Sequence, residues 1–524
     1  MSEEEDNELT EEGEQALKSV AKGAGIAFIG LIFSKIFGYG YNIIAARFLG
    51  PDGYGIISLA GALVSFASVF CILGLNHGIR RYVPFYRGKN NREKVRGTVF
   101  SGLKITSVAT ILVTVLLFFS SDFLATSVFN EPHAALIFKI FSLGLPFYVF
   151  LRSLTSITDA FKKMKYRVIS QDFIWKGLRV FFIAIFVVFM GYDVLGAAYA
   201  YILSYSAAFI VALYFFVKKI FPRVKDAVSQ PNYKELLTYS WPLLFVSVMG
   251  IVLSKTDQIM LGYFLDSSQV GIYKSALLIA AVLAIVLTAL RRILLPVLSD
   301  LLGKDKKQEF TKTFRTATKW SFTATLPLFT VMVLFAPRVL KLIFGEEYTA
   351  GAVALSILAV TYFTKACFGL SSSLLKSLEK TKLILVATVS SGLLNVILNY
   401  LLIPRFGMEG AATAYLLSIV LMYALYLFWS NRYLEANPIK PSLIKPILAT
   451  AGSTTFTYLL FKQLISPVSL WMLPVAFIIF IGLYTFLFLI LGGIEQEDLL
   501  ILKSIERKSG MRIKWLRNLI KKFI

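Results

Sequence analysis

Nine lysine and arginine side chains fall inside apolar stretches that are long enough to cross a membrane, and few carboxylates accompany them. They are Lys35, Lys104, Lys139, Arg152, Lys176, Arg179, Lys255, Lys274 and Lys365. A charged side chain in the hydrocarbon layer costs about 3 kcal/mol or more, so such residues usually have a function. Because the set is so unequal in sign, it predicts that an anion passes between the helices.

The depth of each cation in its apolar stretch suggests a division of roles. Long side chains near the end of a stretch can reach the headgroups, and this applies to Lys104, Lys139 and Lys274. The remaining cations lie within about two turns of a centre, where a rise of about 1.5 Å per residue leaves no easy exit. These are Lys35, Arg152, Lys176, Arg179, Lys255 and Lys365. They come from both halves of the chain, so we expect them to line one central cavity and to bind the phosphates of an anionic substrate.

Helical spacing places several of these cations beside polar residues. One face of a predicted helix carries Tyr148, Arg152, Ser156 and Asp159. In the next helix, the same kind of spacing relates Asp172, Lys176 and Arg179. An ion pair between Asp172 and Lys176 is therefore an alternative, structural role for that lysine.

Asp257 is the carboxylate that lies deepest in the apolar stretches. It is two residues from Lys255, so the two side chains point in different directions and Asp257 needs a partner from another helix. We regard it as a candidate for coupling transport to Na⁺ or to protons. A structural salt bridge to a neighbouring lysine is the alternative.

The chain as a whole has the composition of a polytopic membrane protein. Of its 524 residues, 57% are hydrophobic and 16% are charged, and the mean hydropathy is +0.70, whereas soluble proteins carry about 25% charged residues. Because about 20 apolar residues cross the hydrocarbon layer, we predict an all-α fold of about 14 transmembrane helices. Their approximate ranges are 19–48, 54–79, 97–119, 134–159, 167–190, 194–217, 239–264, 270–295, 313–336, 352–375, 383–403, 408–430, 446–464 and 470–491.

The basic residues outside these spans are distributed unevenly between alternate loops. If the N-terminus is cytoplasmic, 38 Lys and Arg fall in the inner loops and the C-terminal tail, and five fall in the outer loops. This asymmetry predicts a plasma-membrane protein with both termini in the cytoplasm. The net charge of +23 therefore reflects topology. No basic and aromatic platform outside the spans points to nucleic acid.

Two pairs of similar sequence segments predict an internal duplication. Residues 196–204 (GAAYAYILS) and 410–418 (GAATAYLLS) match at seven of nine positions. The pairs Phe48-Leu49 and Gly55-Ile56 recur 216 residues later, as Phe264-Leu265 and Gly271-Ile272. Six spans separate the copies, so the two lobes are parallel and the substrate site is expected between them. The predicted parts are an acidic cytoplasmic tail (1–18), an N-lobe (19–217), a cytoplasmic linker (218–238), a C-lobe (239–430), two further spans (431–492) and a basic amphipathic cytoplasmic tail (493–524).

No motif for catalysis or for a bound cofactor stands out. Both cysteines lie in apolar stretches, and the two histidines lack ligand partners nearby in the sequence, so we predict no disulfide framework and no metal site. No GxxxxGK[ST] motif occurs, which argues against ATP hydrolysis by this chain. We expect no cofactor and no enzymatic activity. A membrane polymerase or glycosyltransferase, the alternative, needs surface acids or a large loop that the chain lacks.

Three segments resemble polysaccharide flippases of the multidrug/oligosaccharidyl-lipid/polysaccharide exporter superfamily, and O-antigen flippases in particular. They are ARFLGPDGYG (46–55), DQIMLGYFL (257–265) with VGIY (270–273), and IPRFGMEGAA (403–412). The resemblance runs over nearly the whole chain. It implies 14 spans with a repeat of six and six helices, and the flipping of an undecaprenyl- or dolichyl-(pyro)phosphate-linked oligosaccharide from the cytoplasmic to the outer leaflet. It also implies a cationic cavity for the phosphates. The expected partners are this substrate, membrane lipids and the glycosyltransferases that assemble the glycan.

A cation-coupled multidrug exporter is the main alternative to a flippase. The multidrug branch resembles this architecture with twelve spans, and it often has a carboxylate in span 1. Here span 1 contains Lys35 and no acid. That difference disfavours drug antiport, although Asp257 keeps the alternative open.

Overall fold

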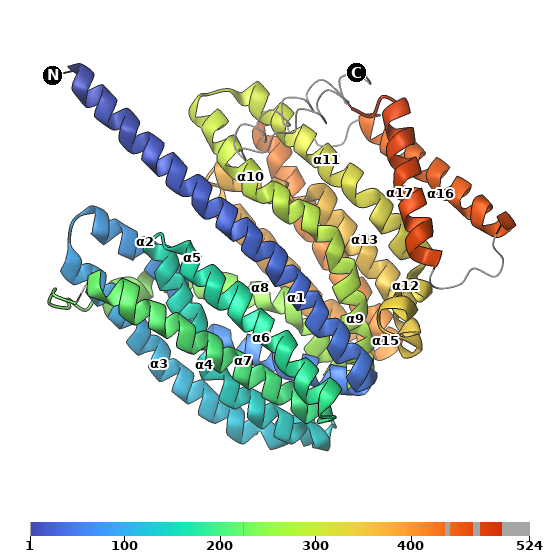
Figure 1. Ribbon diagram of the computed structural model, residues 1–524, viewed down its shortest axis with the longest axis horizontal. Coiled ribbons are helices and arrows are strands. Elements are labelled where there is room, and N and C mark those ends of the chain that lie inside the picture. The colour runs from blue at the N-terminus through green and yellow to red at the C-terminus, as the bar shows by residue number, and fades with distance from the viewer. Residues whose placement is uncertain (1, 224, 435–440, 465–471, 495–524) are drawn as a thin grey trace. The chain divides into compact units, whose positions relative to one another are not determined.

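The computed structural model describes residues 2–223, 225–434, 441–464 and 472–494, with the side chains left aside at 2–28, 292, 293, 296, 461–464 and 473. Across this part the chain is helical and contains no β-strand (Figure 1). It divides into two compact units, Met1–Lys274 and Ser275–Ile524. The predicted all-α architecture is confirmed for the described residues. The predicted basic tail, 493–524, lies outside them beyond residue 494.

The first unit is a bundle in which long helices alternate with short connecting segments. It contains α1 (Ser2–Ile72), α2 (Leu75–Gly88), α3 (Arg92–Phe123), α4 (Ala135–Ala160), α5 (Met164–Arg167), α6 (Trp175–Ile183), α7 (Asp193–Phe215), α8 (Tyr233–Phe264) and the first part of α9 (Ser267–Ala280). In Figure 1, α4 lies between α3 and α7, and α6 packs along α7. Short π-helical turns, Val168–Ile174 and Ala184–Phe189, flank α6 and interrupt the predicted span 167–190.

The second unit begins within α9. It contains α10 (Ala284–Gly303), α11 (Lys307–Leu334), α12 (Ala336–Ile343), α13 (Ala352–Phe368), α14 (Ser371–Ser377), α15 (Thr381–Leu434), α16 (Ile444–Leu464) and α17 (Leu473–Ile490). The division between the units therefore falls after α8, which packs with α1 and α2. The sequence placed the lobe boundary earlier, in the linker 218–238, and those lobe limits stay a prediction.

Membrane-crossing length is reached by eight helices in the described residues, or nine if α11 and α12, bent by 89°, form one span. Two of them are much longer than the roughly 20 residues that one crossing needs: the apolar part of α1 has 44 residues and α15 has 54. Each contains a glycine with positive φ, Gly50 at 67° and Gly407 at 54°. The backbone is not helical at these glycines, so α1 and α15 each consist of two helices joined by a kink. Both glycines lie between neighbouring predicted spans, and each element covers two of those spans.

Two glycines make the closest crossing between α1 and α9. A Cβ atom on Gly55 would collide with the backbone of Ser267. A Cβ atom on Gly271 would lie 2.9 Å from the carbonyl carbon of Pro51 and 3.0 Å from the backbone nitrogen of Gly55. The contacts are reciprocal, because each glycine faces the residue four positions before the other. Glycine is needed at both positions since the opposing atoms belong to the backbone and cannot rotate away.

Candidate functional site

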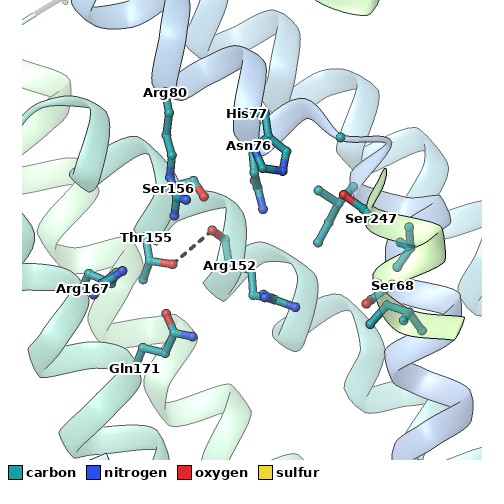
Figure 2. A pocket seen from close by; sticks show the side chains of 15 residues that line it. Ser68, Asn76, His77, Arg80, Arg152, Thr155, Ser156, Arg167, Gln171 and Ser247 are labelled. Atoms are coloured by element: carbon teal, nitrogen blue, oxygen red, sulfur yellow. Dashed lines mark hydrogen bonds between the residues drawn. The ribbon is translucent and has the colours of Figure 1, made fainter. Parts of the chain in front are cut away.

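The first unit contains a polar pocket of about 440 Å³, lined from α1, α2, α4, α8 and the segment that precedes α6 (Figure 2). We call it the arginine pocket, and its polar lining consists of Ser68, Asn76, His77, Arg80, Arg152, Thr155, Ser156, Arg167, Gln171 and Ser247. Figure 2 shows Arg80 and Asn76 extending from α2, and Arg167 and Gln171 reaching in from another side. Three guanidinium groups in one cavity are suited to bind an anion with several oxygen atoms.

Asp159 holds two of these arginines together. Its Oδ2 atom accepts hydrogen bonds from Arg80 Nη2 at 3.0 Å and from Arg167 Nη1 at 3.4 Å. Its side chain is 12% exposed. Asp159 lies in the last turn of α4, where the helix dipole disfavours a negative charge. The two arginines are therefore the groups that stabilise this carboxylate, and they keep a net positive charge after doing so.

Arg80 lies beyond the predicted end of its span, and its surroundings indicate how positive the arginine pocket is. Burial lowers the pKa of its guanidinium, Asp159 opposes that change, and the nearby Arg167 and Arg152 lower the pKa further. An arginine nevertheless stays charged at neutral pH, because its ordinary pKa is above 12. The cluster therefore carries three positive charges against the one negative charge of Asp159.

Arg152 is the predicted substrate-binding residue that lines the arginine pocket. It is exposed, and its Nη1 atom donates a hydrogen bond to the Tyr148 hydroxyl at 2.8 Å. This is the partner that the spacing along the predicted helix placed on the same face. Thr155, one turn later in α4, donates its hydroxyl to the backbone carbonyl oxygens of Leu151 and Arg152.

A second group of cations lies along α1, α6, α8 and α9 in the same unit. We call it the deep cluster, and it consists of Lys35, Lys176, Arg179, Lys255 and Lys274. Electrostatic interactions link Lys176 to Lys35 and to Arg179, and link Arg179 to Lys255 and Lys274. All five side chains are partly buried. Four of the six predicted substrate-binding residues thus form one connected series of electrostatic interactions, from Lys35 through Lys176 and Arg179 to Lys255.

Individual contacts position the deep cluster. Lys176 Nζ donates a hydrogen bond to the carbonyl oxygen of Ser34 at 3.3 Å. The Arg179 guanidinium lies over the Tyr41 ring, 3.8 Å from its centroid, an arrangement that stabilises a cation in a partly buried site. Asp172 interacts electrostatically with Lys176. The structural alternative for this lysine, an ion pair with Asp172, stays a prediction.

Asp257 is 4% exposed and accepts a hydrogen bond at 2.9 Å from the Tyr273 hydroxyl on α9. The prediction that it needs a partner from another helix is confirmed. Tyr273 is fully buried, so this contact holds α8 and α9 together. The role of Asp257 in coupling stays a prediction.

Lys365, the remaining predicted residue, belongs to the second unit and sits among tyrosines. It donates a hydrogen bond to the Tyr415 hydroxyl, and its ammonium group lies 4.4 Å from the ring centroid of Tyr362. Tyr362 and Tyr415 stand 214 residues after Tyr148 and Tyr201. In each unit a cation on one helix is therefore accompanied by tyrosines at repeat-related positions.

The three cations near span ends differ in their surroundings. Lys104 is exposed on α3. Lys139 forms an ion pair with Asp122 at 2.7 Å, and both side chains are solvent-accessible. Lys274 belongs to the deep cluster.

Sequence reasoning missed Arg80, Arg167 and the role of Asp159. The two arginines were counted among the loop residues that set orientation. The available signal was the face shared by Arg152 and Asp159, because an acid at the end of an otherwise cationic helix face requires basic partners.

Comparison with known proteins identifies the family. The family model described as "Polysaccharide biosynthesis protein" matches residues 20–302, more than half of the chain, and a second model, MatE, matches residues 242–401. The chain belongs to the polysaccharide biosynthesis protein family. A relative from Haloferax volcanii, "Probable low-salt glycan biosynthesis flippase Agl15", is 24% identical over 420 residues, which cover 79% of this chain and 81% of the relative.

Solved structures show that the fold of this family member is that of the MOP superfamily. A structure of a multidrug resistance MATE family transporter in an inward-facing conformation superposes with a TM-score of 0.67, at 17% identity, covering 77% of this chain and 95% of that one. The structure of the lipid II flippase MurJ also gives 0.67, at 14% identity, covering 88% of this chain and 97% of that one. The predicted superfamily is confirmed. The chain is a multi-pass membrane protein of a transporter family and not an enzyme. Because the two TM-scores are equal, the fold does not distinguish a flippase from a drug exporter.

Proposed function

We propose that this protein is a flippase that moves a polyprenyl-(pyro)phosphate-linked oligosaccharide from the cytoplasmic to the outer leaflet. The observation that carries the proposal is the deep cluster, in which five cations of one unit lie along α1, α6, α8 and α9 and interact electrostatically. Two carboxylates, Asp172 and Asp257, belong to the same helices and segments, so the positive charges outnumber the negative ones. Partly buried positive charge is tolerated where water or a counter-anion reaches it. A phosphate or diphosphate group supplies such a counter-anion.

Six cations bind the substrate phosphates in this mechanism: Lys35, Arg152, Lys176, Arg179, Lys255 and Lys365. They line a cavity between two lobes, and alternating access exposes it first to the cytoplasm and then to the outside. Two charge-assisted hydrogen bonds, at about 1.5–3 kcal/mol each, help to offset the desolvation of a diphosphate. Cations from both lobes let the substrate favour one conformation through contacts that differ between the two states.

The proposed architecture is a set of 14 spans in which spans 1–6 and 7–12 are repeats and both termini are cytoplasmic. The reciprocal contact of Gly55 with Ser267, and of Gly271 with Pro51, supports the duplication. The offset of 216 residues relates Gly55 to Gly271 and also Pro51 to Ser267. A local two-fold arrangement of the two copies accounts for both contacts at once.

A cation-coupled multidrug exporter is the second candidate, favoured by the MatE match and by the buried Asp257. The charge of the deep cluster disfavours a multidrug exporter, because organic cations are repelled by a site with excess positive charge. The flippase name of the Haloferax relative also favours glycan transport. Membrane lipids and glycan-assembling glycosyltransferases are the proposed partners at the plasma membrane.

Glycan export from cells that lack the native gene tests this function. Arg152→Gln and Lys365→Gln should each abolish export while the protein is still inserted and extracted as a monodisperse species. Lys104→Gln is the matched control, because it removes an exposed cation of the same kind from α3. Wild-type export from a protein in which all six cations are neutralised refutes the flippase mechanism.

A further inference from the structure

The arginine pocket is separate from the six cations of the flippase proposal in all but one residue, Arg152. It lies where α2, α4 and α5 meet, and its charged groups are Arg80, Arg152, Arg167 and Asp159. These groups carry a net charge of about +2 at neutral pH. The predicted topology places this meeting point at the cytoplasmic end of the spans.

Several polar atoms of the arginine pocket lack partners. Among the described residues, buried Arg167 Nε, Asn76 Oδ1 and Asp159 Oδ1 form no hydrogen bond. Buried polar atoms without partners cost stability, so they usually mark a site that water or a ligand completes. Here both donors and acceptors are left over, beside a cavity that can hold a ligand.

Asp159 already occupies the position that an anion would take between Arg80 and Arg167. One carboxylate oxygen accepts from both guanidinium groups, at 3.0 and 3.4 Å. A phosphate has more oxygen atoms than a carboxylate and can accept two-pronged hydrogen bonds from both arginines at the same time. A phosphate group therefore competes with Asp159 for these arginines.

We propose that the arginine pocket is an entry subsite for a phosphate-ester anion, and that Asp159 is an internal competitor which the anion displaces. The proposal rests on the flippase function, since it supplies the place where the substrate phosphate first leaves the cytoplasm. A volume of about 440 Å³ is many times the space that a single water molecule needs. That space accommodates a diphosphate group together with some of its water.

The internal competitor explains how the subsite can bind without trapping its ligand. When the anion leaves, Asp159 returns to Arg80 and Arg167, so the arginines are never left without a counter-charge. Arg152 lies about two turns before Asp159 on α4 and links the arginine pocket to the residues of the flippase proposal. The anion can move from Arg80 and Arg167 to Arg152 without leaving the positively charged region.

Binding of farnesyl pyrophosphate to the purified full-length protein in detergent tests the proposal, with farnesol as the uncharged reference. Arg80→Gln and Arg167→Gln should each weaken the binding about ten-fold or more, and Asp159→Asn should strengthen it. Arg92→Gln is the matched control, because Arg92 is an exposed arginine at the start of α3 outside the arginine pocket. If Arg80→Gln does not fold, Arg80→Lys keeps the charge but loses the two-pronged contact, and it should weaken binding less.

The opposite responses of the arginine and aspartate variants separate a binding role from a structural one. A purely structural ion pair predicts that Asp159→Asn weakens binding as the arginine variants do, and that result overturns the proposal. Unchanged binding in Arg80→Gln and Arg167→Gln also overturns it. Nanodiscs with and without phosphatidylglycerol distinguish the source of the phosphate. If this lipid competes with farnesyl pyrophosphate for the same arginines, the subsite binds a lipid headgroup. If the lipid does not compete, the subsite binds the substrate.

The binding measurement does not depend on the flippase proposal. Farnesyl pyrophosphate carries no glycan, and the assay requires no transport. A failure of the flippase function appears as normal glycan export from the neutralised variants, whereas a failure of the entry subsite appears as the binding pattern described above.

Discussion

Replacing Gly271 with alanine tests whether the crossing of α1 and α9 is as close as the structure requires. The added methyl group would lie 2.9 Å from the Pro51 carbonyl carbon and 3.0 Å from the Gly55 nitrogen, and it would collide with the Pro51 oxygen. Overpacking usually costs about 1–3 kcal/mol. Because the opposing atoms are backbone, relief requires that the two helices separate, and we expect a loss of about 3 kcal/mol in the free energy of unfolding.

A double-mutant cycle with Gly55→Ala sharpens this prediction. Gly55→Ala alone should cost a similar amount, since its methyl group meets the backbone of Ser267 at the same crossing. Once the helices have moved apart for one methyl group, the second is partly accommodated. The double variant should therefore lose about 3–4 kcal/mol rather than about 6 kcal/mol, a coupling within the range known for residues in contact.

Equilibrium unfolding in mixed micelles measures these changes. Cys71 and Cys367 are both buried, so a thiol-reactive fluorophore reports unfolding without an engineered probe. Gly61→Ala is the matched control in α1, because a Cβ atom there has no neighbour within 4 Å. It should be neutral or stabilise the protein by up to about 1 kcal/mol. If Gly271→Ala behaves like Gly61→Ala, or if the double variant is additive, the close crossing does not exist in the folded protein.

Three further predictions concern topology, coupling and a surface ion pair. Single cysteines in loop 120–133 should react with an impermeant thiol reagent in intact cells, and cysteines in loop 299–312 should react only after permeabilisation; the reverse pattern contradicts the proposed orientation. Asp257→Asn should reduce transport and its dependence on Na⁺ or pH, whereas unchanged transport with an unchanged gradient dependence excludes a coupling role. Asp122→Asn breaks the solvent-accessible ion pair with Lys139 and should cost less than about 1 kcal/mol in thermal or chemical unfolding; a larger loss means that the pair is shielded from solvent.

Charge and hydropathy patterns predicted most of what positions the site. The all-α membrane architecture follows from composition, and the grouping of Lys35, Lys176, Arg179 and Lys255 follows from their depth in the apolar stretches. The sequence also predicted that the partner of Asp257 belongs to another helix, because Lys255, two residues away on the same helix, points in a different direction. The identity of that partner, Tyr273, depends on how α9 packs on α8, and local sequence does not contain this information.

The arginine pocket could not be predicted in the same way, because basic residues at span ends have two roles that look alike in a sequence. Arg80 and Arg167 are close to inner loops, where positive charge orients any membrane protein. What distinguishes them is Asp159, and the three residues meet only after α2, α4 and α5 have packed. The glycines at Gly50 and Gly407 have non-helical backbone angles and mark kinks inside α1 and α15, which agrees with the predicted span boundaries at 48–54 and 403–408.

The two cation groups are related through one continuous segment of chain. Arg167 ends α5 and Arg179 lies in α6, twelve residues later. At the α-helical rise of about 1.5 Å per residue this corresponds to at most about 18 Å, because the π-helical segment Val168–Ile174 between them rises less per residue. That distance is a large part of a hydrocarbon layer of about 30 Å. A transported anion must be bound strongly enough to enter and weakly enough to leave. Asp159 beside the first group and Asp172 beside the second each reduce the positive charge that the anion meets. If both groups act as we propose, the two aspartates keep any single position from becoming a trap, and the spacing of the arginines keeps the anion paired as it moves between them.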